Sequence, residues 1–138
     1  MTTNTYLEKQ AKIYKFINFR GVVFKDELSF KPRAIECGIL GSKNHTENDM
    51  HWTAWFKNHG MSYFFDSFGL PPDINLQTYL NTDILYSTFQ VQNFGEDTCG
   101  YWCLWFLYKL NKIKRANGKI EQKDYIDIII RVINNTTF

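Results

Sequence analysis

The chain has 138 residues, of which 44% are hydrophobic and 17% aromatic, and it carries a formal net charge of +2. This length and composition predict one compact domain, residues 1–138, and exclude an intrinsically disordered chain. The small net charge selects no class of partner. No segment approaches the roughly 20 apolar residues of a membrane span, and residues 1–5 lack the pattern of a signal peptide.

The first predicted element is a short helix near the N-terminus. Thr5 and Glu8 form a capping-box pattern there. Apolar side chains then recur at helical spacing, at Leu7, Ala11, Tyr14 and Ile17. A strand is predicted next, over residues 34–40.

A hairpin is predicted in the middle of the chain. Residues 51–57 and 62–65 are aromatic runs with apolar side chains on both faces, as in buried strands at the centre of a sheet. The Asn-His-Gly sequence at residues 58–60 joins them and is a hairpin turn signal. This arrangement places His51 and Asp66 at neighbouring strand ends.

The second half of the chain is predicted to be mainly helical. A short helix begins at Pro71-Pro72-Asp73 and ends near Leu80, and a strand follows over residues 84–91. The longest helix is predicted over residues 99–114, with Gly118 just past its end as a stop signal. Residues 122–133 are rich in β-branched side chains, which are also typical of strands, and a helix is the favoured interpretation.

The three cysteines are an odd set, and Cys99 and Cys103 lie four residues apart on one predicted helix, so a disulfide scaffold is not expected. The cysteines therefore indicate a protein of a reducing compartment rather than of an oxidising one. Zinc is the weaker alternative, because Cys37 with His51 or His59 would have to join the helical cysteines, whereas structural zinc sites usually carry two close-spaced ligand pairs in turns. Cys37 and Cys103 are interpreted as buried apolar side chains, and His59 as a turn residue.

Cys99 has the position that a nucleophilic cysteine needs. An ordinary thiol has a pKa of about 8.5, and the unpaired N–H groups of a first helical turn favour the thiolate. An imidazole beside the sulfur can accept its proton and later protonate a leaving amine, while a carboxylate behind the imidazole fixes the tautomer of the ring. His51 and Asp66 are the candidates for these two roles.

Attack on an amide also builds an oxyanion, and each preorganised donor to it is worth roughly 3–4 kcal/mol. The side-chain amide of Gln92 and the backbone N–H of Cys99 are the candidate donors. Gly100 leaves space beside the nucleophile. Residues 93–97 form the loop that delivers Cys99, and its two acidic side chains are candidate caps of the helix.

Each of these residues also has a structural interpretation. Cysteine in an aromatic helix is usually buried filler, histidine at a strand start is usually structural, and aspartate before Ser-x-Gly usually forms a turn. What distinguishes the set is its joint occurrence in the order His51, Asp66, Gln92, Cys99.

In this order and context the chain resembles the adenovirus endopeptidase (adenain) group of cysteine proteases, which is related in fold to the SUMO-specific proteases. The resemblance covers residues 19–110. Its stretches are Phe19-Arg20-Gly21, residues 32–39, His51-Trp52, residues 63–69, and Gln92 followed after six loop residues by Cys99-Gly100, with Cys103 as a second matching cysteine.

The resemblance implies an α+β fold of the papain-like, adenain type, with a central mixed, mostly antiparallel sheet flanked by helices and the nucleophile at the start of a buried helix. It implies His51 as base, Asp66 as the orienting acid, Gln92 as oxyanion donor and Cys99 as nucleophile. The adenoviral enzymes have Glu as the acid, whereas the SUMO-protease branch has Asp, as here. The cysteine that tethers an activating peptide has no counterpart between Cys37 and Cys99, so covalent activation is not expected in this reduced version of the fold.

The function implied is that of a thiol-dependent endopeptidase that processes viral precursor proteins. It would act as a monomer without a cofactor, inside the host cell, in its cytoplasm or nucleus, or in the virion. A ubiquitin-like-protein deconjugase is the alternative enzyme. Trp52, Trp55 and Trp102 are candidate tunnel residues for it, although core packing is the more expected role.

A catalytically silent binding domain of the same fold is an alternative of a different class. The basic cluster Lys109, Lys112, Lys114 and Arg115 suggests weak nucleic-acid contact. Cations near the end of a helix also stabilise its dipole without any partner. Retention of all four catalytic residue types favours the enzyme.

Overall fold

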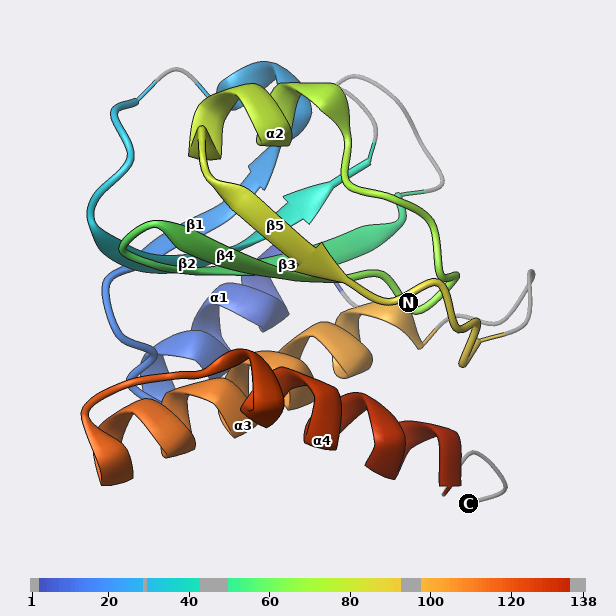
Figure 1. Cartoon of the computed structure of the whole chain (residues 1–138). Coiled ribbons are helices and arrows are strands. Elements are labelled where there is room, and N and C mark those ends of the chain that lie inside the picture. Colours follow the sequence, from blue (N-terminus) through green and yellow to red (C-terminus); the bar gives the residue numbers. More distant parts are fainter. Residues whose placement is uncertain (1–2, 29, 43–49, 93–97, 135–138) are drawn as a thin grey trace.

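The computed structural model describes residues 3–28, 30–42, 50–92 and 98–134. Its strands are β1 (Phe19–Phe24), β2 (Ile35–Gly41), β3 (Trp52–Asn58), β4 (Met61–Phe65) and β5 (Asp83–Tyr86). Its helices are α1 (Asn4–Ile13), α2 (Ile74–Leu80), α3 (Cys99–Asn117) and α4 (Gln122–Asn134), with a short 3-10 turn, η1 (Lys25–Glu27). The sheet forms the middle layer, with α2 over one face and α1, α3 and α4 over the other (Figure 1). The expected α+β fold class is confirmed.

The five strands lie in the order in which they occur along the chain. The inner pairings, β2 with β3 and β3 with β4, are antiparallel, and the outer pairings, β1 with β2 and β4 with β5, are parallel. The sheet is therefore mixed, with antiparallel pairing at its centre and parallel pairing at both edges. The predicted hairpin is present, and His59 occupies its turn with a left-handed φ of 59°.

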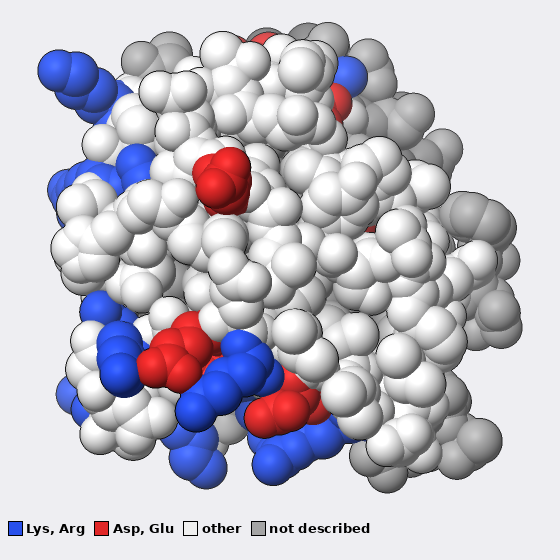
Figure 2. Space-filling model, in the orientation of Figure 1, with Lys and Arg blue, Asp and Glu red and all other residues white. Residues whose placement is uncertain are grey.

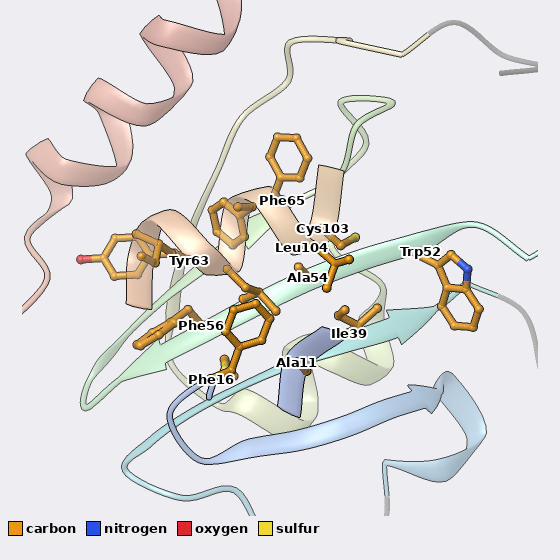
Figure 3. Packing of buried hydrophobic residues seen from close by; sticks show 14 of the residues in the cluster. Ala11, Phe16, Ile39, Trp52, Ala54, Phe56, Tyr63, Phe65, Cys103 and Leu104 are labelled. Atoms are coloured by element: carbon orange, nitrogen blue, oxygen red, sulfur yellow. The ribbon is translucent and has the colours of Figure 1, made fainter. Parts of the chain in front are cut away.

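Alternate side chains of the central strands point to opposite faces of the sheet, and both faces are buried. Figure 3 shows Ile39, Ala54, Phe56, Tyr63 and Phe65 packing together with side chains of α1 and α3. The side chains between them point to the other face. There Leu40, Trp55 and Phe64 pack against Leu76 and Tyr79 of α2.

A buried carboxylate lies under α2. The Glu36 side chain is fully buried and accepts hydrogen bonds from Trp55 Nε1 at 3.0 Å and from the Tyr79 hydroxyl at 2.7 Å. The backbone N–H of Arg33 donates to it at 2.6 Å. Beside this cluster the Trp55 indole lies directly over Gly38, where a Cβ would overlap the ring. A glycine in β2 is what lets the indole approach the sheet so closely.

The predicted elements differ from the observed ones in three places. The N-cap of α1 is Thr3, whose hydroxyl accepts from Tyr6 N at 3.1 Å, so the predicted capping box at Thr5 is wrong. Strand β1 was not predicted. Strand β5 ends at Tyr86, short of the expected end at residue 91.

The two C-terminal helices match their predictions. Helix α3 runs to Asn117 and stops at Gly118, whose left-handed φ of 76° makes it the C-cap. The isoleucine-rich segment is helical, with Tyr125, Ile128 and Val132 buried along one side. Among the described residues, no helix combines the length and the apolar character that crossing a bilayer would require.

Candidate active site

Three of the predicted site residues lie at element ends that meet at one side of the sheet. His51 directly precedes β3 and Asp66 directly follows β4, and because these strands are antiparallel neighbours, the two residues lie side by side. Cys99 is the first residue of α3. The backbone N–H of Trp52 donates to Cys99 Sγ at 3.4 Å, which joins the start of the helix to the start of β3.

The His51 ring is hydrogen-bonded on both sides. Its Nε2 lies 2.6 Å from Asp66 Oδ1, and the ring also hydrogen-bonds the Cys99 side chain, for which Nδ1 is the remaining nitrogen. Burial works to lower the pKa of His51, but the hydrogen bonds and negative charges of Asp66 and Cys99 outweigh it and raise that pKa to about 9. The geometry therefore favours the protonated form of the His51 ring.

Asp66 is held in turn by the residues that follow it. Its side chain is buried, and Oδ1 also accepts from the backbone N–H of Phe68 at 2.8 Å. The Phe68 ring stacks on the His51 ring, with the centroids 4.1 Å apart and the planes 10° apart. The imidazole is thus fixed at its edge by a carboxylate and on its face by a phenyl ring.

The three sulfur atoms have different surroundings. Cys99 is buried, and a backbone N–H and the His51 ring hydrogen-bond its sulfur. Burial raises the pKa of the Cys37 thiol to about 12 and that of Cys103 well above its usual value. All three are free thiols, and the prediction that Cys37 and Cys103 are buried apolar side chains is confirmed.

Gln92 is attached to the same turn through Ser67, the residue after Asp66. The Gln92 side chain is buried, and its Oε1 accepts from Ser67 Oγ at 2.5 Å. The backbone N–H groups of Val91 and Gln92 both donate to the Ser67 carbonyl, at 2.9 and 3.1 Å. The predicted loop over residues 93–97, with its acidic candidate caps, lies outside the described residues.

Sequence reasoning missed the parts played by Ser67, Phe68 and Gly69. Gly69 has a left-handed φ of 73°, and a Cβ there would lie 2.5 Å from the backbone oxygen of Thr88. The Asp-Ser-Phe-Gly stretch was visible as a turn signal. What could not be seen was its set of partners, because His51 and Gln92 lie far away along the chain.

The basic cluster is partly engaged within the fold. Lys114 Nζ donates to Gly118 O at 2.9 Å, and the Arg115 guanidinium donates to backbone oxygens just after α1. Lys109 and Lys112 line a cavity of about 360 Å³ together with acidic side chains of α4. Figure 2 shows basic and acidic side chains mixed over α4 and the turn before it. Nucleic-acid contact through this cluster stays a prediction.

Zinc is the weaker alternative for the cysteines and histidines. Within the described ranges, no group of three His, Cys, Asp or Glu side chains is placed to hold a metal ion. What does gather is a thiol, an imidazole and a carboxylate in hydrogen-bonded series, at the first turn of a helix. Such a series can supply a thiolate nucleophile and an imidazolium acid within one assembly.

The comparisons with known proteins concern the fold. No protein-family model matches the chain, and no curated protein matches its sequence. A crystal structure of the Se-Met form of the ASFV pS273R protease matches with a TM-score of 0.56 and 14% identity, over 90% of this chain and 64% of that chain. A second crystal structure of ASFV pS273R protease gives a TM-score of 0.50 and 15% identity, over 88% and 63% of the two chains.

The chain therefore spans slightly less than two thirds of the length of that protease. At these identities the match concerns the fold, and it does not single out the adenain group. The chain has the fold of the ASFV pS273R protease.

Proposed function

We propose that this chain is a cysteine endopeptidase in which Cys99 is the nucleophile, His51 the acid–base, Asp66 the orienting carboxylate and Gln92 an oxyanion donor. The observation that supports this most is the hydrogen bonding of the His51 ring on both sides, to Asp66 at 2.6 Å and to the Cys99 sulfur. A structural histidine needs no such pairing with a thiol at a helix start.

In the proposed reaction, Cys99 Sγ attacks the carbonyl carbon of a peptide bond and the carbonyl oxygen becomes an oxyanion. The side-chain amide of Gln92 and the backbone N–H of Cys99 donate to it. Collapse breaks the C–N bond, and His51 gives its proton to the leaving amine. Water then loses a proton to His51 and attacks the thioester carbonyl. The C–S bond breaks, the acid product is released, and a Cys99 thiolate is left beside the protonated His51, ready for the next substrate.

The substrates we propose are precursor proteins of a virus or virus-like element. Two observations support this proposal: the fold is similar to that of the ASFV pS273R protease, which is a viral enzyme, and the site motifs resemble those of the adenain group. It is a proposal about the natural role, separate from the chemistry of the site.

The chemistry is tested by alkylation of the thiols with iodoacetamide at about pH 6, followed by mass mapping. An ordinary thiol is almost fully protonated at that pH and reacts slowly. We expect fast modification of Cys99 alone in the wild type and its loss in His51→Ala. Cys37 and Cys103 are internal controls. His59→Asn, at an exposed turn, is the matched histidine variant and should react like the wild type. Slow labelling of Cys99 would contradict the proposal.

A deconjugase of ubiquitin-like proteins would use the same chemistry and would pass the same test. Its expected tunnel residues do not form one lining, because Trp52 and Trp55 are buried on opposite faces of the sheet. The two enzymes are separated by offering the chain a ubiquitin-like fusion beside an unfolded polypeptide. A catalytically silent binding domain would cleave neither the ubiquitin-like fusion nor the unfolded polypeptide.

A further inference from the structure

Ser67 makes contacts that its position in a turn does not require. Its side chain is buried, with 1% of the residue exposed, and its hydroxyl donates to Gln92 Oε1 across 25 residues of sequence. At 2.5 Å this is a short O–H···O contact. The carbonyl of the same residue accepts from the N–H groups of Val91 and Gln92. Backbone and side chain of Ser67 therefore hold the same partner segment.

These contacts decide the orientation of the Gln92 amide. The terminal torsion of a glutamine is broad and roughly two-fold, so a carboxamide can present either its oxygen or its NH₂ to a given side. Donation by the Ser67 hydroxyl favours the oxygen on the Ser67 side. The NH₂ of the same planar group then points away from Ser67, and only the NH₂ can donate to an oxyanion.

We propose that Ser67 is a positioning residue that locks the Gln92 side chain with its NH₂ turned toward the oxyanion. The inference rests on the proposed function, since an oxyanion donor matters only if Cys99 attacks carbonyl groups. By this inference, the turn after β4 orients two parts of the site, the imidazole and the oxyanion donor. Asp66 orients the imidazole through its side chain, and the next residue orients the oxyanion donor.

Two reagents distinguish the reactivity of the Cys99 thiolate from stabilisation of the oxyanion, and neither requires that the natural substrate be known. Iodoacetamide is attacked by a thiolate at carbon and loses iodide, so it needs no oxyanion donor. p-Nitrophenyl acetate is attacked at its carbonyl, passes through an oxyanion, and loses p-nitrophenolate while Cys99 becomes acetylated. The ratio of the two rates at Cys99 therefore measures oxyanion stabilisation, and a general loss of structure would lower both rates.

For Ser67→Ala we expect an unchanged alkylation rate and an acetylation rate lower by about tenfold, because loss of orientation forfeits part of the 10²–10³ that one donor contributes. Ser67→Thr retains the hydroxyl and should recover most of the rate. Ser62→Ala is the matched control. Ser62 is also a buried serine with a side-chain hydrogen bond, to Thr82 at 2.6 Å, but it lies on β4 away from Gln92. It should leave both rates unchanged.

A double-mutant cycle then asks whether Ser67 acts through Gln92. Gln92→Ala should lower acetylation by at least as much as Ser67→Ala, and the double variant should be no slower than Gln92→Ala alone. Gln92→Glu is a second variant that leaves Ser67 in place, and it can be used if Ser67→Ala does not fold. Its carboxylate still accepts from the hydroxyl but has no NH₂, so acetylation should fall to the Gln92→Ala rate.

Each remaining outcome counts against one claim. Acetylation of Ser67→Ala at the wild-type rate, additive losses in the double variant, or a wild-type rate in Gln92→Glu would overturn the role of Ser67. An equal fall of both reagents' rates in Ser67→Ala would show a structural residue. If wild-type Cys99 is neither alkylated nor acetylated faster than an ordinary thiol, the proposed peptidase site itself fails, and the inference falls with it.

Discussion

At the scale of single residues, the Asp66 carboxylate serves two purposes. It accepts from the Phe68 N–H, which closes the turn, and it pairs with His51 Nε2 at 2.6 Å. Because the carboxylate carries a negative charge, the pairing both orients the ring and favours its protonated form. An amide at the same place would keep much of the orientation and lose the charge.

Asp66→Asn should therefore shift the titration of His51. The pKa of His51 is raised to about 9, so the wild-type ring keeps its proton up to that pH and loses it above. Without the charge at position 66 the pKa falls, and the proton is lost at lower pH. NMR titration of the ring measures this directly. Asp73→Asn, at the N-cap of α2, is the control and should leave the His51 titration in place.

The same variant should lower peptide turnover by more than tenfold, since the corresponding change in a serine protease triad costs about 10⁴ in kcat. We expect the remaining activity to be measurable and its alkaline limit to move to lower pH. Measurement of kcat against pH on a peptide found by substrate screening checks both expectations. A loss smaller than tenfold would count against Asp66 as the third member of the triad.

At the scale of elements, the close approach of β2 and β3 side chains stabilises the face under α2. Trp55 is fully buried and lies over Gly38, and its indole N–H is bonded to the buried Glu36 carboxylate. Since Tyr79 of α2 donates to the same carboxylate, the indole, the strand and the helix are held in one arrangement. A shift of the indole away from Gly38 would therefore disturb these hydrogen bonds.

Gly38→Ala should lower the free energy of unfolding by about 1–3 kcal/mol, the usual cost of overpacking a core. Gly60→Ala is the matched control, because a Cβ there meets nothing within 4 Å and the backbone is not left-handed. It should be neutral to within about 0.5 kcal/mol. Urea unfolding followed by tryptophan fluorescence compares the two. Equal midpoints for both variants would mean that the indole adjusts freely.

The elements that could be predicted from the sequence are those with local signals. The β3–β4 hairpin has aromatic runs around an Asn-His-Gly turn, and α3 has its glycine stop. Strand β1 has no such signal. It pairs in parallel with β2, so no tight hairpin turn joins the two strands, and its register shifts between Phe19 and Val22, near Gly21 with a φ of 117°. The candidate residues could be chosen by type and order, but the contacts of Ser67 depend on tertiary structure alone.

At the scale of the whole molecule, the candidate site exists only where separate segments meet. His51 and Asp66 come from the ends of a hairpin, and Cys99 comes from a helix that packs across the sheet. The sulfur reaches the ring only when α3 is docked, and the docking surface of α3 is the main core (Figure 3). Site assembly and core packing are therefore one event.

Loss of the candidate site should coincide with global unfolding. In a urea series, the fast alkylation of Cys99 at about pH 6 and the tryptophan fluorescence signal should change with one midpoint, as for a two-state domain. Cys37 and Cys103, which burial protects, should become available to the reagent at that midpoint as well. Loss of Cys99 reactivity at clearly lower urea would show that α3 undocks before the core unfolds.

Gly69, the left-handed glycine of the turn after β4, limits which substitutions this chain can accept during evolution. A Cβ at position 69 would lie 2.5 Å from Thr88 O, and that oxygen belongs to backbone that cannot swing aside as a side chain can. Mutational drift is therefore blocked at a position that never touches the reacting atoms. We therefore expect chains related to this one to keep a glycine three places after the acid, and a sequence alignment of such chains would check this.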